Sequence, residues 1–585
     1  MLNRKSNAAP AARLRRSSIS FLRIAVRDAL PAVAFALAAF GATAQTVAPA
    51  LPAGARQAAD SITAAEIRAQ VRFLSGDLLE GRGTGQRGGN LAAEYIAAQF
   101  ALDGLQPAGD NGTYLQRVPF VGIATVPART SFQLVPQRGA AIVLRYGDDY
   151  VANNETATPR AEIDAPIVYV GHGIHAPEYQ WDDFKGVDVR GKILLVLGNE
   201  PPSKDVKFFN GPALTYYGRW TYKYEEASRR GAIGVLIIHR TDLASYGWDV
   251  VRNSWSGEHA YLQNDPLATL QAASWIQTSV AQQLFRAAGL DPDKMIAAAD
   301  TRGFRPVVLP VHLKATIVSQ VRRFTSNNVV AMLPGADRAS GAAAGRDQAV
   351  LYTAHYDHLG IDPSRKGDQI YNGAVDNGTG CGILLAIAHA YSRASVRPPH
   401  SVLFASVTAE EQGLLGSEYL GMHPPVPAGQ ITLDLNYDAL LPVGIPQSTS
   451  VTGAERTTFY PVVEQTARQF DLKIEPDSNP SAGHYYRSDH FSLARVGIPS
   501  FSIGEGVLFE GRTRSWGIAQ DAEYTAKHYH QPSDEFNPQW DFSGLAKMAR
   551  FGFVLGWKAS ELPQPIGWQP GDEFAAARQR SLQGQ

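Results

Sequence analysis

The sequence predicts an α/β fold, in which a mixed, mostly parallel sheet flanked by helices is interrupted by an inserted β-rich domain. Three observations support this prediction. The 585 residues are too many for one ordinary hydrophobic core, so two domains are expected. After Asn327, strand-like and helix-like segments alternate, as in sheets with substantial parallel pairing. Between about residues 130 and 310, short β-like runs dominate and no dense cluster of His, Asp and Glu occurs.

The alternating segment contains four strand candidates and two helices between them. In sheets of this kind, ligands bind at the carboxyl ends of the strands. The polar residues that directly follow each apolar run are therefore the candidates for chemistry. The strands are expected at residues 328–333, 349–353, 402–406 and 433–437, and the helices at 380–392 and 414–419.

The inserted segment has three clear apolar runs, at residues 165–170, 192–197 and 232–238, and a helix at about 223–230. Upstream of it, a glycine-rich turn from Gly81 to Gly89 precedes an amphipathic helix at about 90–102. The turn contains GTGQRG (83–88), which matches the dinucleotide fingerprint GxGxxG. That fingerprint requires a preceding strand, whereas the residues before it have helical periodicity. A tight turn is the better interpretation.

The N-terminus is typical of a signal peptide, expected to span residues 1–44. Basic residues precede an apolar run from Ala29 to Ala42, and small residues then offer a cleavage site before Gln45. The alternative is a membrane anchor, but the run is shorter than the ~20 residues that a spanning helix needs. We expect a periplasmic or secreted protein with no membrane association after cleavage.

Composition narrows the function classes further. Hydrophobic residues make up 44% and charged residues 19%, which is normal for a soluble globular protein. The net charge of −1 gives no field that favours nucleic acid, so no nucleic-acid partner is expected. Cys381 is the only cysteine, which excludes an intrachain disulfide. Peptide substrates are the expected partners, and the sequence does not predict an oligomeric state.

Two motifs with ligand-like residues follow the first strand of the alternating segment. His355 is followed two positions later by Asp357, a spacing that suits a metal ligand with a carboxylate that orients it. Asp376 lies in a glycine-rich loop before a helix. A carboxylate there could bridge two cations with its two oxygens, although an ordinary Asp-Asn-Gly turn would look the same.

Three further motifs follow in the same order along the chain. Glu410 and Glu411 come after an apolar strand, so one can bind metal while the other holds a water for deprotonation. Asp438 follows the next strand, and Tyr529 and His530 occur late in the chain. Each motif is weak alone, but four of the five fall on strand-to-loop transitions.

The combination resembles the MH-clan zinc exopeptidases, the family of secreted bacterial leucyl aminopeptidases and of glutamate carboxypeptidase. The resemblance covers roughly residues 60–125 and 315–560. It implies a discontinuous zinc peptidase domain (60–130 and 311–560) around an inserted protease-associated domain (131–310). The matching stretches are HYDHLG, AVDNGTG, TAEEQGLLGS, NYDA, SDHFSLARVGIP and YHQPSDEF, with LLEGRGTGQRGGNLAAEYIAAQF near the start.

Carried over residue by residue, the resemblance implies a site with two zinc ions. His355 and Asp438 would hold one zinc, Glu411 and His530 the other, and Asp376 would bridge them. Glu410 would be the general base of an aminopeptidase that releases N-terminal amino acids. Asp357 would orient His355, Tyr529 would serve as an oxyanion donor, and Ser488, Asp489 and His490 would support the pocket.

Several alternatives stay open. A carboxypeptidase would need an arginine for the substrate carboxylate, for which Arg487, Arg512 and Arg514 are candidates. A glutaminyl cyclase shares the fold but uses one zinc, and a non-catalytic binding module, as in transferrin receptor, would lack the ligands. The sequence has no G-x-S-x-G elbow and no H-E-x-x-H motif, which disfavours a serine hydrolase of that type and a zincin.

Overall fold

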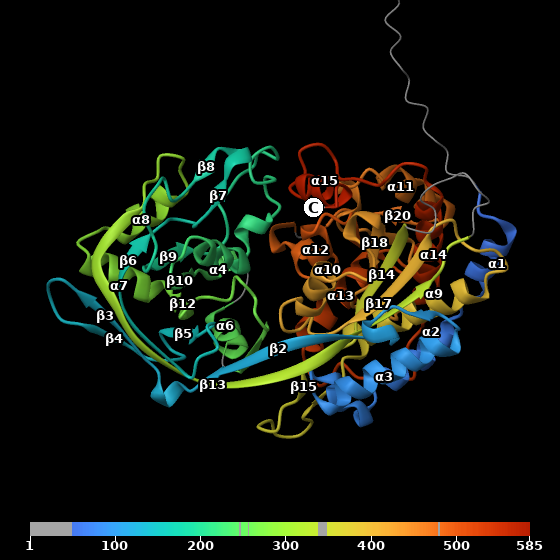
Figure 1. Cartoon of the computed structure of the whole chain (residues 1–585), viewed down its shortest axis with the longest axis horizontal. Helices are drawn as coiled ribbons and strands as arrows, with labels where there is room; N and C mark the ends of the chain where they lie inside the picture. Colours follow the sequence, from blue (N-terminus) through green and yellow to red (C-terminus); the bar gives the residue numbers. More distant parts are fainter. Residues whose placement is uncertain (1–49, 245–246, 256, 337–347, 478–479, 585) are drawn as a thin grey trace, which may run out of the picture. The chain divides into compact units, whose positions relative to one another are not determined.

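The computed structural model describes residues 50–244, 247–255, 257–336, 348–477 and 480–584 (Figure 1). The expected signal peptide, residues 1–44, lies outside this part of the chain. In the residues that are described, no helix combines the length and the hydrophobicity needed to cross a bilayer.

One sheet carries the segments predicted to alternate. Four of its strands are parallel neighbours, and the fifth pairs antiparallel with the outer one. The predicted mixed, mostly parallel sheet is thus confirmed, and the predicted strands differ from the observed ones by only one to two residues at most ends. The strand order is β21 (Ser500–Ser502), β18 (Ile431–Asn436), β14 (Ala349–His355), β17 (Ser401–Val407) and β13 (Val307–Leu333).

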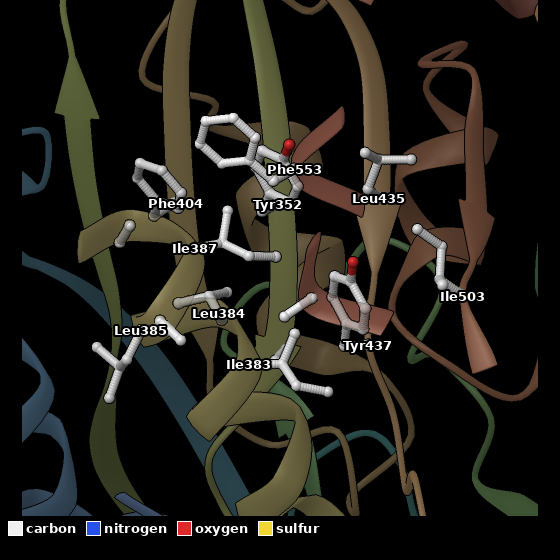
Figure 2. Packing of buried hydrophobic residues seen from close by; sticks show 14 of the residues in the cluster. Tyr352, Ile383, Leu384, Leu385, Ile387, Phe404, Leu435, Tyr437, Ile503 and Phe553 are labelled. Atoms are coloured by element: carbon white, nitrogen blue, oxygen red, sulfur yellow. The ribbon is translucent and has the colours of Figure 1, made fainter. Parts of the chain in front are cut away.

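Helices cover both faces of this sheet. Side chains along a strand alternate between faces, so Tyr352 and Leu351 enter different cores. The larger core lies against α9, from which Ile387 lies near Tyr352 and Ile383 near Tyr437 (Figure 2). Around the larger core are α1 (Ala53–Ser61), α2 (Ala64–Leu74), α3 (Arg87–Leu102), α9 (Gly380–Arg393) and α14 (Ser543–Glu561), and on the other face are α10 (Leu415–Met422) and α12 (His490–Arg495).

The inserted segment forms its own sheet, with three parallel pairings in its centre. It is less purely β than expected, because helices pack on both of its faces. The order is β13, β6 (Arg160–Tyr169), β9 (Ile193–Leu197), β10 (Gly234–His239), β12 (Ala272–Gln277) and β5 (Tyr150–Asn153), with α7 (Thr278–Ala287) and α8 (Pro292–Ala299) on one face and α4 (Trp220–Arg229) on the other. Its assignment as a protease-associated domain stays a prediction.

Strand β13 belongs to both sheets. Its first part pairs with β6 and with β3 (Ser131–Pro136), its middle with β2 (Leu115–Thr125), and its last residues with β17. The long β13 and its partner β2 stand out in Figure 1 as the ribbon that connects the two sheets. The boundary expected at residue 310 therefore falls inside a continuous strand.

The remaining elements are short or peripheral. Near the site, α13 (Arg514–Lys527) precedes His530, and β11 (Glu258–Leu262) pairs with β2. The others include β4 (Ile142–Leu144), β7 (His175–Ala176), β8 (Trp181–Asp182), β15 (Gly360–Ile361), β16 (Ile370–Tyr371), β19 (Ser448–Ser450), β20 (Lys473–Ile474), β22 (Gly504–Glu505), α11 (Tyr460–Gln469) and α15 (Ala575–Leu582).

Candidate metal centre

The five predicted metal ligands come together at one edge of the first sheet. His355 is the last residue of β14, Glu411 lies four residues beyond the end of β17, and Asp438 lies two beyond the end of β18. Because these three strands are parallel neighbours, their carboxyl ends meet at the same edge. Asp376 reaches this edge from the loop before α9, and His530 from the turn after α13.

Asp376 lies between two separate groups of donors. Its Oδ1 is 3.3 Å from His355 Nε2, and its Oδ2 is 3.2 Å from His530 Nε2. His355 Nε2 is also 3.2 Å from Asp438 Oδ1, and His530 Nε2 is 3.1 Å from Glu411 Oε2. Each group thus contains one histidine, one carboxylate of its own and one oxygen of Asp376. This is the grouping that the sequence predicts, and the ligand roles themselves remain predictions.

The donor set fits a small divalent cation. Zinc takes imidazole nitrogens and carboxylate oxygens at ~2.0–2.2 Å, so the ligands of a tetrahedral ion lie about 3.3 Å apart. The four distances from a histidine nitrogen to a carboxylate oxygen, 3.1–3.3 Å, match that spacing. The charges of the surrounding carboxylates also favour a bound cation. Burial opposes protonation of His355, yet Asp438 and Glu410 raise the pKa of His355 well above its usual range. The cluster therefore attracts positive charge.

Glu410 lies between the two groups, with a carboxylate oxygen within 4.8 Å of donor atoms of His355 and Glu411. Its Oε2 is 3.9 Å from His355 Nε2, too far for a hydrogen bond. Burial raises the pKa of Glu410 well above its ordinary value, an effect that His355 opposes and Glu411 reinforces. The preceding Ala409 has a φ of 57°, and this sharp turn allows adjacent glutamates to face different neighbours. A buried carboxyl in this position can accept and release a proton.

The predicted role of Asp357 needs correction in its detail. The Nδ1 atom of His355 is 3.2 Å from the main-chain oxygen of Asp357, whereas the carboxylate Oδ1 is 3.9 Å away. The carboxylate instead accepts hydrogen bonds from Thr84 Oγ1 at 2.8 Å and from the main-chain amide of Glu410 at 3.1 Å. The main-chain carbonyl of Asp357, rather than its side chain, is thus the partner of the imidazole. Asp357 therefore contacts His355 through its main-chain oxygen and the backbone of Glu410 through its side chain.

Ser488 supports the site as expected, through a contact that the sequence does not show. Its hydroxyl donates a 2.6 Å hydrogen bond to Asp438 Oδ2 and accepts one from Asn436 Nδ2 at 2.7 Å. Asp489 and His490 are buried next to it. The signal available in the sequence was the motif SDHFSLARVGIP, which does not reveal which of its polar residues reaches the metal ligands.

Sequence reasoning missed the part played by His358. Its Nδ1 is 2.6 Å from Glu411 Oε1, and its donor atoms lie within 4.8 Å of those of Asp376 and Glu411. It can therefore orient Glu411, and it offers the second donor group an imidazole in addition to that of His530. The ring centroids of the two histidines are 5.7 Å apart. The signal was present in the motif HYDHLG, where only the first histidine was considered a ligand.

Tyr529 lies at the mouth of the cluster. Its ring stacks on that of His530 with centroids 3.9 Å apart, and the residue is 46% exposed. A phenol in this position is free to meet an incoming molecule, and its role as an oxyanion donor stays a prediction. Of the three arginines considered for a carboxypeptidase, Arg514 pairs with Glu475 and Arg512 lies over the ring of Trp516.

Comparison with known proteins agrees with this geometry. Residues 328–551 match the model of Peptidase family M28. The sequence is 30% identical over 436 residues to the probable leucine aminopeptidase 2 of Aspergillus oryzae, a match that covers 72% of this chain and 72% of that protein. The chain belongs to peptidase family M28. The membership that the motifs indicated is thereby confirmed.

Other relatives of this M28 family member match it less completely. Leupeptin-inactivating enzyme 1 of Streptomyces exfoliatus is 26% identical over 231 residues, which are 38% of this chain and 47% of that enzyme. The chain thus spans about half the length of that relative. Among solved structures, the aminopeptidase from Aneurinibacillus sp. strain AM-1 matches with a TM-score of 0.46 and 18% identity, covering 88% of this chain and 98% of that one.

Proposed function

We propose that this chain is a zinc-dependent aminopeptidase with two zinc ions in one site. The observation that carries the proposal is the position of Asp376, whose two oxygens each approach a different histidine. A carboxylate shared in this way is the bridging ligand that a two-metal hydrolase needs. His355 and Asp438 would hold one ion, and Glu411 and His530 the other.

The chemistry divides between the ions and the protein. Two bound zinc ions would polarise the scissile carbonyl and make water a stronger nucleophile. Glu410 would accept the proton of the attacking water at its carboxylate and deliver it to the leaving amine nitrogen. Asp357 would hold the backbone of Glu410 in place, and Tyr529 would donate a hydrogen bond to the oxygen on which negative charge develops.

Two features favour an aminopeptidase over a carboxypeptidase. Two of the three candidate arginines, Arg514 and Arg512, are engaged by Glu475 and Trp516 respectively, and the exposed Arg487, next to Ser488, is the one that a carboxypeptidase would have to use. The relative from Aspergillus oryzae is named a leucine aminopeptidase, which supports the same polarity.

The test measures two quantities for the same protein: the rate of hydrolysis of aminoacyl-p-nitroanilides and the number of zinc ions bound per chain. We expect two zinc ions per chain, loss of activity with a chelator and recovery on adding zinc. Glu410→Gln should keep both ions and lose at least a thousandfold in kcat, while the exposed Glu94→Gln serves as the matched control. One zinc per chain with cyclisation of N-terminal glutamine would favour a glutaminyl cyclase, and cleavage of N-blocked dipeptides alone a carboxypeptidase.

We also propose that the protein is exported and acts on peptides outside the cytoplasm. The support is the basic and apolar N-terminal sequence up to Ala44. Mass spectrometry of the protein recovered from its native cells should find a mature N-terminus at or near Gln45. A full-length chain beginning at Met1 would contradict export by this route.

A further inference from the structure

The turn that matches GxGxxG contains a charged side chain buried in the core of the peptidase domain. Arg82 is 1% exposed. Its Nε donates to the carbonyl of Tyr356 at 2.7 Å, Nη1 to Asn372 at 2.6 Å and to Leu74 at 2.5 Å, and Nη2 to Gly373 at 2.8 Å. All four hydrogen bonds found for it in the described residues go to main-chain oxygens. Burying a guanidinium is costly unless its donors are satisfied, so this position is specific to arginine.

The carbonyls that Arg82 holds belong to the loops of two metal ligands. Tyr356 directly follows His355, and Gly373 lies three residues before Asp376. The guanidinium is planar and rigid, so donors on its different edges fix the separation of these two loops. The separation that results is the 3.3 Å between His355 Nε2 and Asp376 Oδ1.

Two residues further along, Thr84 reaches the general base. Its hydroxyl donates to Asp357 Oδ2 at 2.8 Å, and the other oxygen of that carboxylate accepts from the main-chain amide of Glu410 at 3.1 Å. The main-chain oxygen of Arg82 also accepts from the amide of His358 at 3.2 Å. One short turn thus contacts two loops, the one that follows His355 and the one that precedes Asp376, and it reaches the backbone of Glu410 through Asp357.

The glycines of the turn make this close approach possible. Gly81 has a φ of 65°, and a Cβ there would lie 2.4 Å from the oxygen of Gly360 and 2.5 Å from that of Tyr371. A side chain at Gly88 would lie 1.7 Å from the oxygen of Leu79. The turn is preceded by α2 and entered through a 3-10 segment, Asp77–Arg82, in which Glu80 and Gly81 have positive φ, so no strand precedes it as a dinucleotide fold would require. The glycine pattern serves the packing of this turn against the site.

We propose that the turn from Arg82 to Thr84 is a positioning element of the site, in which each of the two side chains has a separate task. Arg82 sets the spacing of the His355 and Asp376 loops, and so sets metal affinity. Thr84 sets the placement of Glu410 through Asp357, and so sets the rate of proton transfer. The inference rests on the proposed two-zinc function and extends it to residues more than 270 positions away in sequence.

The experiment compares Arg82→Lys with Arg578→Lys, and Thr84→Val with Thr125→Val. Arg578 is also buried and donates to the main-chain oxygens of Ile566 and Ile431, so its variant controls for loss of a buried guanidinium. Thr125 is buried in β2 with its hydroxyl on the carbonyl of Ala152, and it controls for loss of a buried hydroxyl. Zinc affinity by chelator competition, kcat, KM and thermal midpoint are measured for these four variants and for Thr84→Ser.

We expect Arg82→Lys to weaken zinc binding by about 10–100-fold, the usual effect of removing a group that orients a ligand, while Arg578→Lys keeps wild-type affinity. Thr84→Val should keep both zinc ions and lower kcat about tenfold at unchanged KM, and Thr84→Ser should restore it. Hydrogen exchange of the metal-free protein should show faster exchange at 373–378 in Arg82→Lys only.

Equal thermal destabilisation of both arginine variants, with zinc affinity and kcat unchanged in every variant, would overturn the inference and leave the proposed function intact. A wild-type protein that binds no zinc would overturn both. If Arg82→Lys does not fold, the test is the kcat of Thr84→Val, which removes the hydrogen bond to Asp357, against that of Thr84→Ser, which keeps it. Equal kcat values in these two variants would overturn the inference.

Discussion

The carboxylate of Asp534 accepts a hydrogen bond from the main-chain amide of Asp376, with Oδ2 3.1 Å from the nitrogen. The amide of Val375 donates to the same carboxylate at 3.0 Å. Asp534 follows His530 by four residues. The segment that carries one predicted zinc ligand, His530, therefore also holds the loop that carries the predicted bridging ligand, Asp376.

Replacing Asp534 by Asn should therefore weaken metal binding. The amide group of Asn can accept from one main-chain N–H but would present its own donors to the other. We expect about a 10–100-fold loss of zinc affinity, the effect typical of orienting groups. Asp291→Asn is the matched control, because Asp291 accepts from the amides of Asp293 and Lys294 at the start of α8. Equal zinc affinity in both variants would count against the role of Asp534.

Removing the hydroxyl of Ser488 should disturb only one of the two zinc ions. Ser488→Ala leaves Asp438 Oδ2 without its 2.6 Å hydrogen bond, whereas Glu411 and His530 keep their contacts. We expect about a tenfold weaker affinity for one ion and an unchanged affinity for the other, measured by stepwise zinc titration of the metal-free protein. Ser560→Ala, in α14, removes a buried hydroxyl bonded to the carbonyl of Trp557 and should leave both ions unchanged.

Glu155 in the inserted domain should make stability fall as pH rises. Burial raises the pKa of Glu155 from its ordinary 4.5 to about 8, although the amide of Leu270 donates to it. Above about pH 4.5 this carboxyl ionises in the unfolded chain but stays protonated in the folded protein. The free energy of unfolding therefore falls as the pH rises from about 4.5 to about 8, and below this range Glu155 does not lower it.

Glu155→Gln should therefore unfold with nearly the same free energy as wild type near pH 4.5, and with about 4 kcal/mol more at pH 8. Urea denaturation at a series of pH values measures the difference, in which the contribution of the metal site cancels. Glu94→Gln, on the exposed side of α3, should show no such trend. A constant difference across the range would contradict the assignment.

The contact between α14 and β18 should tolerate no added side-chain volume. A Cβ at Gly552 would lie 1.6 Å from the hydroxyl of Tyr437, which is fully buried and directly precedes Asp438 (Figure 2 shows its ring beside Ile503). We expect Gly552→Ala to lower the free energy of unfolding by about 1–3 kcal/mol and to displace the strand end that carries Asp438. Gly567→Ala, where a Cβ meets nothing within 4 Å, is the control.

The sequence predicts the strands of the first sheet well because each is an apolar run that ends in a polar motif. Ala349 to Ala354 followed by His355 is one such run, and it is observed as β14. Parallel pairing then brings His355, Glu411 and Asp438 to one edge with no further information. The convergence of these residues could thus be predicted, although their separations could not.

What the sequence could not supply depends on contacts between distant segments. Nothing in the sequence near Arg82 indicates that its side chain is buried beneath Tyr356 and Gly373, because exposed and buried arginines look alike in a turn. The function of Asp357 depended on a local rotation that exchanged the side chain for the carbonyl as the partner of His355. The sequence analysis also missed two helices of the inserted domain, α7 and α8, which follow one another after the short strand β12 and so show no repeating alternation of strand and helix.

A strand shared by two sheets limits how the molecule can be divided. Cutting the chain between residues 126 and 306 to release the inserted part would strip β13 of its pairing with β6 and β3 and leave about half of the strand without partners. Unpaired strand edges promote aggregation, so neither fragment is suited to independent expression. The two sheets should accordingly lose their structure in a single cooperative transition, and proteases should find no cleavable linker at either junction.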